Sequence, residues 1–452
     1  MKKLLLVATL LIAVSITAQR VKGTILDLET NRPIDDVHIQ IGKDIVVTNK
    51  KGKFSFKAPK NWDRTLFLSH VSYQEKEIPY EKDERLTIYL AKKRINLQEV
   101  FVVGNKGENT LKFTELPDMP RKLHSFASVT RDDKLYVFGG DRSFEVDTNR
   151  KALSETAESG LTDFGTGAIS PMDFFFRRAI LYTPYFDHSE DIYSYDFNTK
   201  RWSKEEIELR KRSNHSATII GNKAYILGGK RMSKNRRNIY LDEKVEVFDL
   251  DAKTLKVDDV NPHRAVGLET FAYKDRMIAL GGSIKEKRNG KVIFTQKVHS
   301  YNPKTGLWYE LAKIPIRGEV STCLVGDRLY FFNSEENKES SSITSVDLVT
   351  GRFRKEGQLL YKFEKPAVAK KDKTIFLFEN RKLLSYNTET KELKSYLIDL
   401  GLLASKSYFF NDSLYILGGF SKVDFELRPS RKFYKIDLST FKKTRARKYV
   451  KL

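Results

Sequence analysis

The stretch HSATIIGNKAYILGG, residues 215–229, decides the fold. Two runs rich in β-branched and aromatic residues flank a short Gly-Asn turn, which predicts a pair of antiparallel strands. A pair of glycines ends the second run. Comparable runs are LYVFGG, MIALGG and LYILGG, ending at Gly140, Gly282 and Gly419, and the degraded LYFFNS and TIFLFE, ending at Ser334 and Glu379. The unit therefore occurs six times.

A second repeated stretch follows each copy after a loop. Examples are YSYDFNTKRW and VHSYNPKTGLW. Together the two stretches predict four short antiparallel strands, which cannot bury both faces of their sheet alone. Stacking such sheets around an axis buries both faces and leaves only short edges. From the third copy onward the copies repeat at roughly 40 to 53 residues, which is typical of propeller blades.

These motifs resemble the kelch β-propeller over residues 110–452, with six blades and an insertion in the first blade at residues 141–192. The resemblance implies that Tyr195 with Trp202, and Tyr301 with Trp308, pack between blades. The corresponding position of the sixth copy is Lys443, which packs poorly. We therefore expect a strand at about residues 110–116, with Phe113 in the tryptophan position, to complete the sixth blade. The alternative is that residues 441–449 supply this strand.

Residues 19–103 form a separate region with seven short strand-like runs between turn-forming residues, which suggests a small β-sandwich. Its segments VKGTILD, TNRPIDDVHI, TNKKGKFSF and LQEVFVVG resemble the carboxypeptidase regulatory-like domain. That resemblance implies a transthyretin-like sandwich with no catalytic role. The predicted fold class is thus all-β: a small transthyretin-like sandwich, a linker at residues 104–109 and a six-bladed kelch propeller.

Residues 1–18 have the pattern of a secretory signal, with Lys2 and Lys3 before an apolar run and cleavage expected after Ala18. A membrane anchor is the alternative, although the run is shorter than the roughly 20 residues that a span needs. No later apolar stretch is long enough to cross a bilayer. We expect an exported protein, located in the periplasm, on the outer-membrane surface or outside the cell.

The composition excludes several kinds of chemical site. The formal net charge is +22, and a single cysteine, Cys323, rules out an intrachain disulfide or a cysteine-based zinc site. Neither metal-ligand spacing nor a cofactor motif is present, so no metal and no cofactor are expected. Charge alone suggests nucleic acid, but export and the lack of a reading motif argue against it. The sequence leaves the oligomeric state open.

Candidate ligand-binding residues stand where the first strand of each blade begins. Because antiparallel strands alternate in direction, these positions share one face with the loops that join the second and third strands. Those loops are long and basic, and arginine suits carboxylate or phosphate groups. The expected partner is an anionic glycan or an envelope protein. The candidates are Arg121, His124, Arg212, His215, Glu269, Arg317 and Glu319. The alternative is that these residues belong to the ordinary kelch scaffold.

Two functions from different classes remain open. The first is a binding or adaptor protein without a catalytic set. The second comes from the resemblance, since some six-bladed kelch proteins are periplasmic sialic-acid mutarotases that act through an arginine and an acid near the axis. Arg121, Arg212, Glu269 and Glu319 are the candidates for such an enzyme, with the acid moving the proton. Substrate-dependent mutarotation would distinguish the two.

Overall fold

The computed structural model describes residues 20–28, 30–42, 44–59, 62–80, 86–92, 109–159, 170, 172–173, 175–177, 184–236, 238–258, 260–287, 289–316, 318–334, 340–423 and 425–452. The predicted signal at residues 1–18 and nearly all of the predicted linker lie outside these residues. The chain divides into two compact units, residues 1–96 with 351–355 and residues 97–350 with 356–452. No helix among the described residues is long and apolar enough to cross a membrane.

The first unit is the predicted sandwich. Strands β4, β1 and β7 form one sheet, and β3, β2, β5 and β6 form the other. Side chains alternate along β1, so that Val21 and Ile25 are buried with Ile39 and Leu68 of the second sheet. The strands are β1 (Arg20–Asp27), β2 (His38–Ile41), β3 (Asp44–Val47), β4 (Lys53–Lys57), β5 (Thr65–His70), β6 (Tyr73–Pro79) and β7 (Leu86–Leu90).

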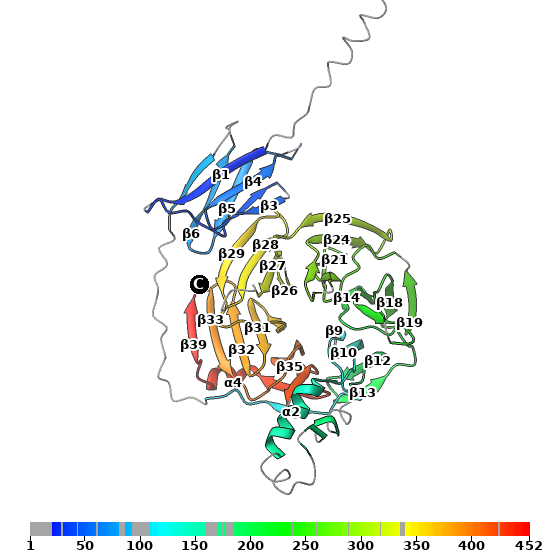
Figure 1. Cartoon of the computed structure of the whole chain (residues 1–452). Helices are drawn as coiled ribbons and strands as arrows, with labels where there is room; N and C mark the ends of the chain where they lie inside the picture. Colours follow the sequence, from blue (N-terminus) through cyan, green and yellow to red (C-terminus); the bar gives the residue numbers. More distant parts are fainter. Residues whose placement is uncertain are drawn as a thin grey trace, which may run out of the picture. The chain divides into compact units, whose positions relative to one another are not determined.

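The second unit consists of small antiparallel sheets set around one axis (Figure 1). In its described residues, six sheets have four or five strands each, one for each copy of the repeat. We call these sheets blades one to six in chain order. Blade one comprises β9 (Ala127–Arg131), β10 (Lys134–Asp141), β12 (His188–Asp196) and β13 (Arg201–Lys204). Blade two comprises β14 (Ser216–Ile220), β15 (Lys223–Leu227), β18 (Val245–Asp249) and β19 (Thr254–Asp258). Blade three comprises β20 (Glu269–Tyr273), β21 (Arg276–Leu280), β24 (Lys297–Asn302) and β25 (Leu307–Lys313).

The degraded fourth and fifth copies also form complete blades. Blade four comprises β26 (Val320–Val325), β27 (Arg328–Asn333), β28 (Ser342–Asp347) and β29 (Phe353–Gln358). Blade five comprises β30 (Ala367–Lys371), β31 (Thr374–Glu379), β32 (Lys382–Asn387), β33 (Glu392–Leu397) and β39 (Lys448–Lys451). Blade six comprises β34 (Lys406–Phe410), β35 (Ser413–Leu417), β38 (Phe433–Asp437) and β8 (Thr114–Leu116).

The N-terminal strand β8 completes blade six, as the sequence predicts. It pairs with β38 so that Leu116 faces Phe433. Continuing this register places Phe113 opposite Ile436, in the way that Trp202 lies opposite Tyr195 in blade one. The alternative of closure by residues 441–449 is wrong. Helix α4 (Leu438–Lys443) follows β38, and β39 then pairs with β33 as the fifth strand of blade five.

The tryptophans pack as the resemblance implies and also anchor the chain between blades. The ring centroids of Tyr195 and Trp202 are 5.0 Å apart. The Trp202 indole N–H donates a hydrogen bond to the Pro117 carbonyl at 2.9 Å, next to β8. The contact therefore ties the closing segment of blade six to the outer strand of blade one.

The glycine pairs are needed because two backbones approach closely. A Cβ on Gly229, at φ +83°, would lie 2.4 Å from the Ser213 carbonyl oxygen of the segment that leads into β14. In blade five, which lacks the glycine pair, a side chain makes the contact with the segment that leads into the inner strand. The Glu379 carboxylate, at the end of β31, accepts the backbone N–H groups of Glu364 and Lys365 at 2.9 and 2.7 Å. Loss of the glycines therefore does not prevent the blade from forming.

Among the described residues, four blades carry extensions at the end of the unit where their inner strands begin, which we call the loop face. Each extension starts with a bridge to the segment that leads into the inner strand, as in Ser213 with Lys230 and Leu403 with Phe420. The extensions contain β11 (Glu145–Val146) and α2 (Thr148–Ser159) in blade one, β16 (Lys230–Met232) and β17 (Ile239–Leu241) in blade two, β22 (Ser283–Glu286) and β23 (Val292–Phe294) in blade three, and β36 (Phe420–Val423) and β37 (Glu426–Pro429) in blade six.

Candidate functional site

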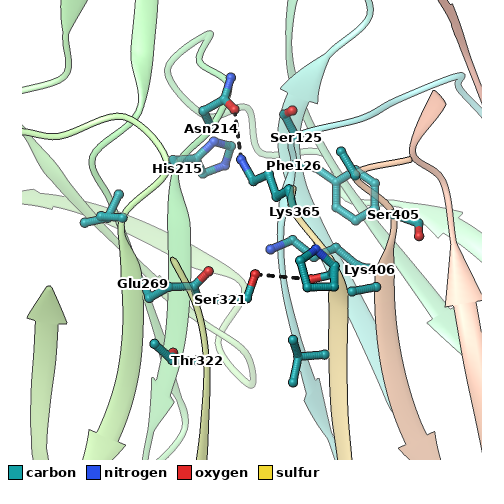
Figure 2. A pocket seen from close by; sticks show the side chains of 16 residues that line it. Ser125, Phe126, Asn214, His215, Glu269, Ser321, Thr322, Lys365, Ser405 and Lys406 are labelled. Carbon is teal, nitrogen blue, oxygen red and sulfur yellow. Dashed lines mark hydrogen bonds between the residues drawn. The ribbon is translucent and has the colours of Figure 1, made fainter. Parts of the chain in front are cut away.

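An axial cavity of about 90 Å³ lies where the inner strands of all six blades meet. The first residues of these strands face it, so equivalent positions of the repeat determine its chemistry. Glu269 begins β20 of blade three, and Lys406 begins β34 of blade six. Figure 2 shows their charged ends pointing toward each other from opposite sides of the cavity.

Burial shifts the pKa values of both groups. Desolvation raises the pKa of the Glu269 carboxyl, and the positive charges of Lys406 and Lys365 oppose this effect. Desolvation likewise lowers the pKa of the Lys406 ammonium, against the attraction of Glu269. The acid and the base are thus shifted toward each other, which makes proton transfer between them, or to a small polar guest, easier than in water.

Lys365 spans the cavity above this pair. Its ammonium donates to the Asn214 Oδ1 at 3.3 Å, a bond from blade five to blade two (Figure 2). His215 lines the same region, and its Nε2 bonds to the Phe138 carbonyl at 2.9 Å. Desolvation holds the pKa of His215 well below its usual range, so the ring stays neutral. The cavity is smaller than the several hundred Å³ of typical small-molecule sites.

A second pair of cavities opens on the loop face beside blades six and one. They measure about 410 and 270 Å³ and share Lys122 and Arg431 in their walls. The smaller one is lined by Pro120, Arg121, Lys122, Arg142 and Arg431, so four of its five residues are cationic. We call this pair the basic cavity.

Several cations of the basic cavity are partly neutralised. Arg431 pairs with Asp118 at 2.9 Å, and Arg142 pairs with Asp187. Among the ion pairs between described residues, none involves Arg121 or Lys122. Both of these side chains are exposed. The cavity therefore combines oriented guanidinium groups with cations that remain available to an anion.

Arg121 and Arg212 stand at the start of the same Arg-x-x-His motif, yet their surroundings differ. Arg212 is 0% exposed, and its guanidinium pairs with Glu246 and, at 3.4 Å, with Asp242. Glu246 faces Ile226 in blade two, and Tyr193 faces Val137 at the equivalent position of blade one. Arg121 therefore meets the hydroxyl of Tyr193 where Arg212 meets a carboxylate.

The structure disperses the other predicted site residues. His215 and Glu269 line the axial cavity, while Arg121 lines the basic cavity. Arg212 lines neither. Glu319 is exposed, and Arg317 lies outside the described residues. The seven candidates thus do not form one site.

His124 is buried in a polar cluster that resembles a catalytic triad only in composition. Its Nε2 lies 3.9 Å from Asp141, and desolvation lowers its pKa to about 4. The cluster also contains His188, whose Nε2 is 3.1 Å from the Ser213 Oγ and 3.6 Å from Asp141. A triad needs the carboxylate at the other ring nitrogen. This arrangement therefore does not activate Ser213 as a nucleophile.

Sequence reasoning missed Lys365, Lys406, Arg142 and Arg431. Lys406 could have been found, since it begins the sixth inner strand as Glu269 begins the third. No comparable signal marks Arg142 and Arg431, which meet only because blade six closes against blade one. Within the described part of the chain, no group of three His, Cys, Asp or Glu residues could hold a metal ion.

The comparisons with known proteins agree with this architecture. A family model described as the KLHDC2/KLHL20/DRC7 Kelch-repeats domain matches residues 182–333. The chain carries kelch repeats. A second model, the CarboxypepD_reg-like domain, matches residues 21–102. The kelch unit thus follows a carboxypeptidase regulatory-like domain.

A search of solved structures finds a chain titled "Structure of YjhT" with a TM-score of 0.49 and 12% sequence identity. That match covers 70% of this chain and 96% of the other. No curated protein matches.

Proposed function

We propose that this protein is an exported binding or adaptor protein of the cell envelope, and that its kelch unit recognises an anionic partner on the loop face. The basic cavity carries the proposal. Four of the five residues that line its smaller part are cationic, and Arg121 meets Tyr193 where the equivalent arginine of blade two meets Glu246. Replacement of the carboxylate by a phenol leaves the guanidinium able to take an external anion.

The chemistry of the cavity favours a carboxylated glycan. Arginine offers paired N–H donors that match a carboxylate. The larger part of the cavity, about 410 Å³, lies in the size range of small-molecule sites and is also lined by Tyr434, Ser421 and Ser430. These hydroxyl groups suit the hydroxyls of a sugar. An acidic segment of an envelope protein is the other partner that the same cations would bind.

Calorimetric titration with an oligomer of galacturonic acid and with its methyl-esterified form tests this proposal. We expect the acid to bind and the neutral ester to bind much more weakly. Arg121→Ala should weaken binding about tenfold, because a hydrogen-bonded ion pair is lost. Arg201→Ala is the matched control, since this exposed arginine begins β13, away from the loop face. Equal binding of the ester, or an unchanged Arg121→Ala variant, would contradict the proposal.

Export is tested separately. Cell fractionation followed by N-terminal sequencing of the native protein should place it outside the cytoplasm and give Gln19 as the first residue. A cytoplasmic chain that retains Met1 would exclude export while leaving the binding proposal intact.

A second candidate function is an enzyme of the sugar-acid mutarotase kind, and the Glu269–Lys406 pair favours it. Burial raises the pKa of Glu269 and lowers the pKa of Lys406, which suits proton transfer by this acid and base. Lys365 must then swing away from Asn214 to admit a sugar. NMR detection of sialic-acid anomerisation tests the idea: catalysis that Glu269→Gln abolishes would support an enzyme, and an uncatalysed rate with the native protein would exclude it.

A further inference from the structure

Exposed apolar side chains are concentrated on the loop-face extensions. Among the described residues twenty large hydrophobic side chains are exposed, and eleven of them lie in the extensions of blades one, two, three and six. Each extension presents a pair of them. The pairs of blades two and six lie at or near the hairpin turn, whereas the pair of blade one lies at the base of its extension, where Tyr185 bridges to Phe144. The pairs are Tyr185 with Phe186, Ile239 with Tyr240, Ile284 with Val292, and Val423 with Phe425.

The extensions of blades two and three are strongly basic, whereas residues 141–187 of blade one contain five Lys or Arg against eight Asp or Glu. Residues 230–244 of blade two contain six Lys or Arg against two Asp or Glu, and residues 283–297 of blade three contain five against one. One of the two acids in blade two, Asp242, is buried, and it pairs with Arg212 and with Arg231 of the extension. In blade three, Lys285, Lys287 and Lys291 are exposed around Ile284 and Val292.

Contacts join the extensions of blades six, one and two, and the extension of blade three follows on the same face. Strand β11 of blade one pairs with β37 of blade six, and the Arg236 guanidinium of blade two lies 5.1 Å from the ring centre of Tyr185. A buried ion pair between Lys151 and Glu426 reinforces the first junction. Blade five has no extension, since only Asn380 and Arg381 join β31 to β32. We call the extensions of blades six, one, two and three the rim.

We propose that the rim docks this protein onto an anionic lipid surface. The lysine and arginine side chains would bind headgroup phosphates, and the apolar tips would enter the boundary between headgroups and acyl chains. Tyrosine, phenylalanine and branched aliphatic side chains flanked by cations suit that boundary. A protein partner fits less well, because a protein interface buries one continuous apolar core, whereas these pairs stand on separate extensions, and those of blades two and three stand among cations.

This inference uses the face of the proposed function but rests on other residues. The basic cavity depends on Arg121 and Arg431, and lipid docking depends on the tips of the rim. Either can fail without the other. A rim held at a membrane would place the basic cavity near an anionic surface, where acidic glycans of the envelope could reach it.

Co-sedimentation with lipid vesicles tests the proposal. The full chain should sediment with phosphatidylcholine vesicles that contain phosphatidylglycerol, and not with pure phosphatidylcholine. The double substitution Ile239→Ser with Tyr240→Ser removes side chains that are 62% and 54% exposed, and should weaken vesicle binding about tenfold. The matched control is Leu307→Ser with Tyr309→Ser on β25, where the side chains are 54% and 43% exposed. The control should bind as the native protein does.

Two further experiments distinguish docking on a membrane from binding of a free phosphate and from binding of an acidic glycan. Glycerol phosphate, which carries the headgroup chemistry without a membrane, should not displace the protein from vesicles, because the apolar tips have no counterpart in it. Arg121→Ala should sediment normally while losing affinity for oligogalacturonate. No sedimentation with phosphatidylglycerol vesicles, or equal binding by the Ile239→Ser, Tyr240→Ser variant, would overturn lipid docking.

Discussion

At the residue scale, a shared sequence motif does not imply a shared role. Arg121 and Arg212 both precede a histidine by three positions. The side chain that each arginine contacts determines whether that arginine is buried or exposed. Glu246 holds Arg212 within blade two, and Tyr193 leaves Arg121 at the surface. Local sequence cannot show this, because the deciding residue lies 34 positions from Arg212 along the chain.

Arg212 is therefore predicted to be a stability residue. Arg212→Ala leaves Glu246 buried without its cation, which costs about 3–5 kcal/mol of the free energy of unfolding, while Asp242 keeps Arg210. Urea denaturation measures this loss, and the exposed Arg201→Ala serves as the control. A stable Arg212→Ala protein that has lost only its affinity for an acidic glycan would show that Arg212 is a ligand residue after all.

Two buried histidines predict how stability depends on pH. Burial lowers the pKa values of His124 and His263 from 6.5 to about 4. Between pH 6.5 and 4 the unfolded chain binds these protons more readily than the folded one, so stability falls as the pH falls through this range. Each histidine contributes up to about 3 kcal/mol, and the raised pKa of Glu269 offsets part of this loss.

Thermal unfolding of the native protein and of His263→Gln at pH values from 7 down to 4 checks this prediction. The variant should show the weaker pH dependence. Parallel curves would mean that His263 does not contribute in this range.

At the scale of elements, the strands were largely predictable and the extensions were not. The glycine pairs and the turns located the repeats, and the apolar runs located the strands even in the degraded copies, because the β pattern survives where the glycines are lost. The chemistry of the axis was only half visible. The sequence predicts Glu269 as a site residue and not Lys406, although each begins the inner strand of its blade.

The predicted tryptophan position in the sixth blade gives a further test. Phe113 packs edge to face with Tyr434, with the ring centroids 5.2 Å apart. Phe113→Ala should lower the free energy of unfolding by about 2 kcal/mol, less than for a fully buried phenylalanine. Phe425→Ala, which removes an exposed ring on the loop face, is the control and should change it by less than about 0.5 kcal/mol. Equal effects of the two substitutions would argue against the closing role of Phe113.

At the scale of the whole molecule, the ring closes through a strand that comes before all of its repeats. A chain that begins at residue 109 keeps β8 beside β38, and a chain that begins at residue 118 loses it. We expect the first to unfold cooperatively in calorimetry. The second should unfold at a lower temperature, because β38 becomes an open edge. Identical transitions would show that β8 does not hold the ring together.

The division of the kelch unit into a rigid ring and a basic loop face could be anticipated only in part. The repeat predicted the ring, and the composition of the loops predicted a basic face. The basic cavity was not predictable, because Arg121 and Arg431 are separated by 310 positions and meet only when blade six closes against blade one.

The most direct test of the account is hydrogen–deuterium exchange of the full chain with and without oligogalacturonate. The account predicts slower exchange in the two segments that line the basic cavity, residues 118–122 and 428–432, and unchanged exchange on the outer strands β13 and β25. Protection confined to the inner strands around Glu269 and Lys406 would contradict it and would move the binding site to the axis.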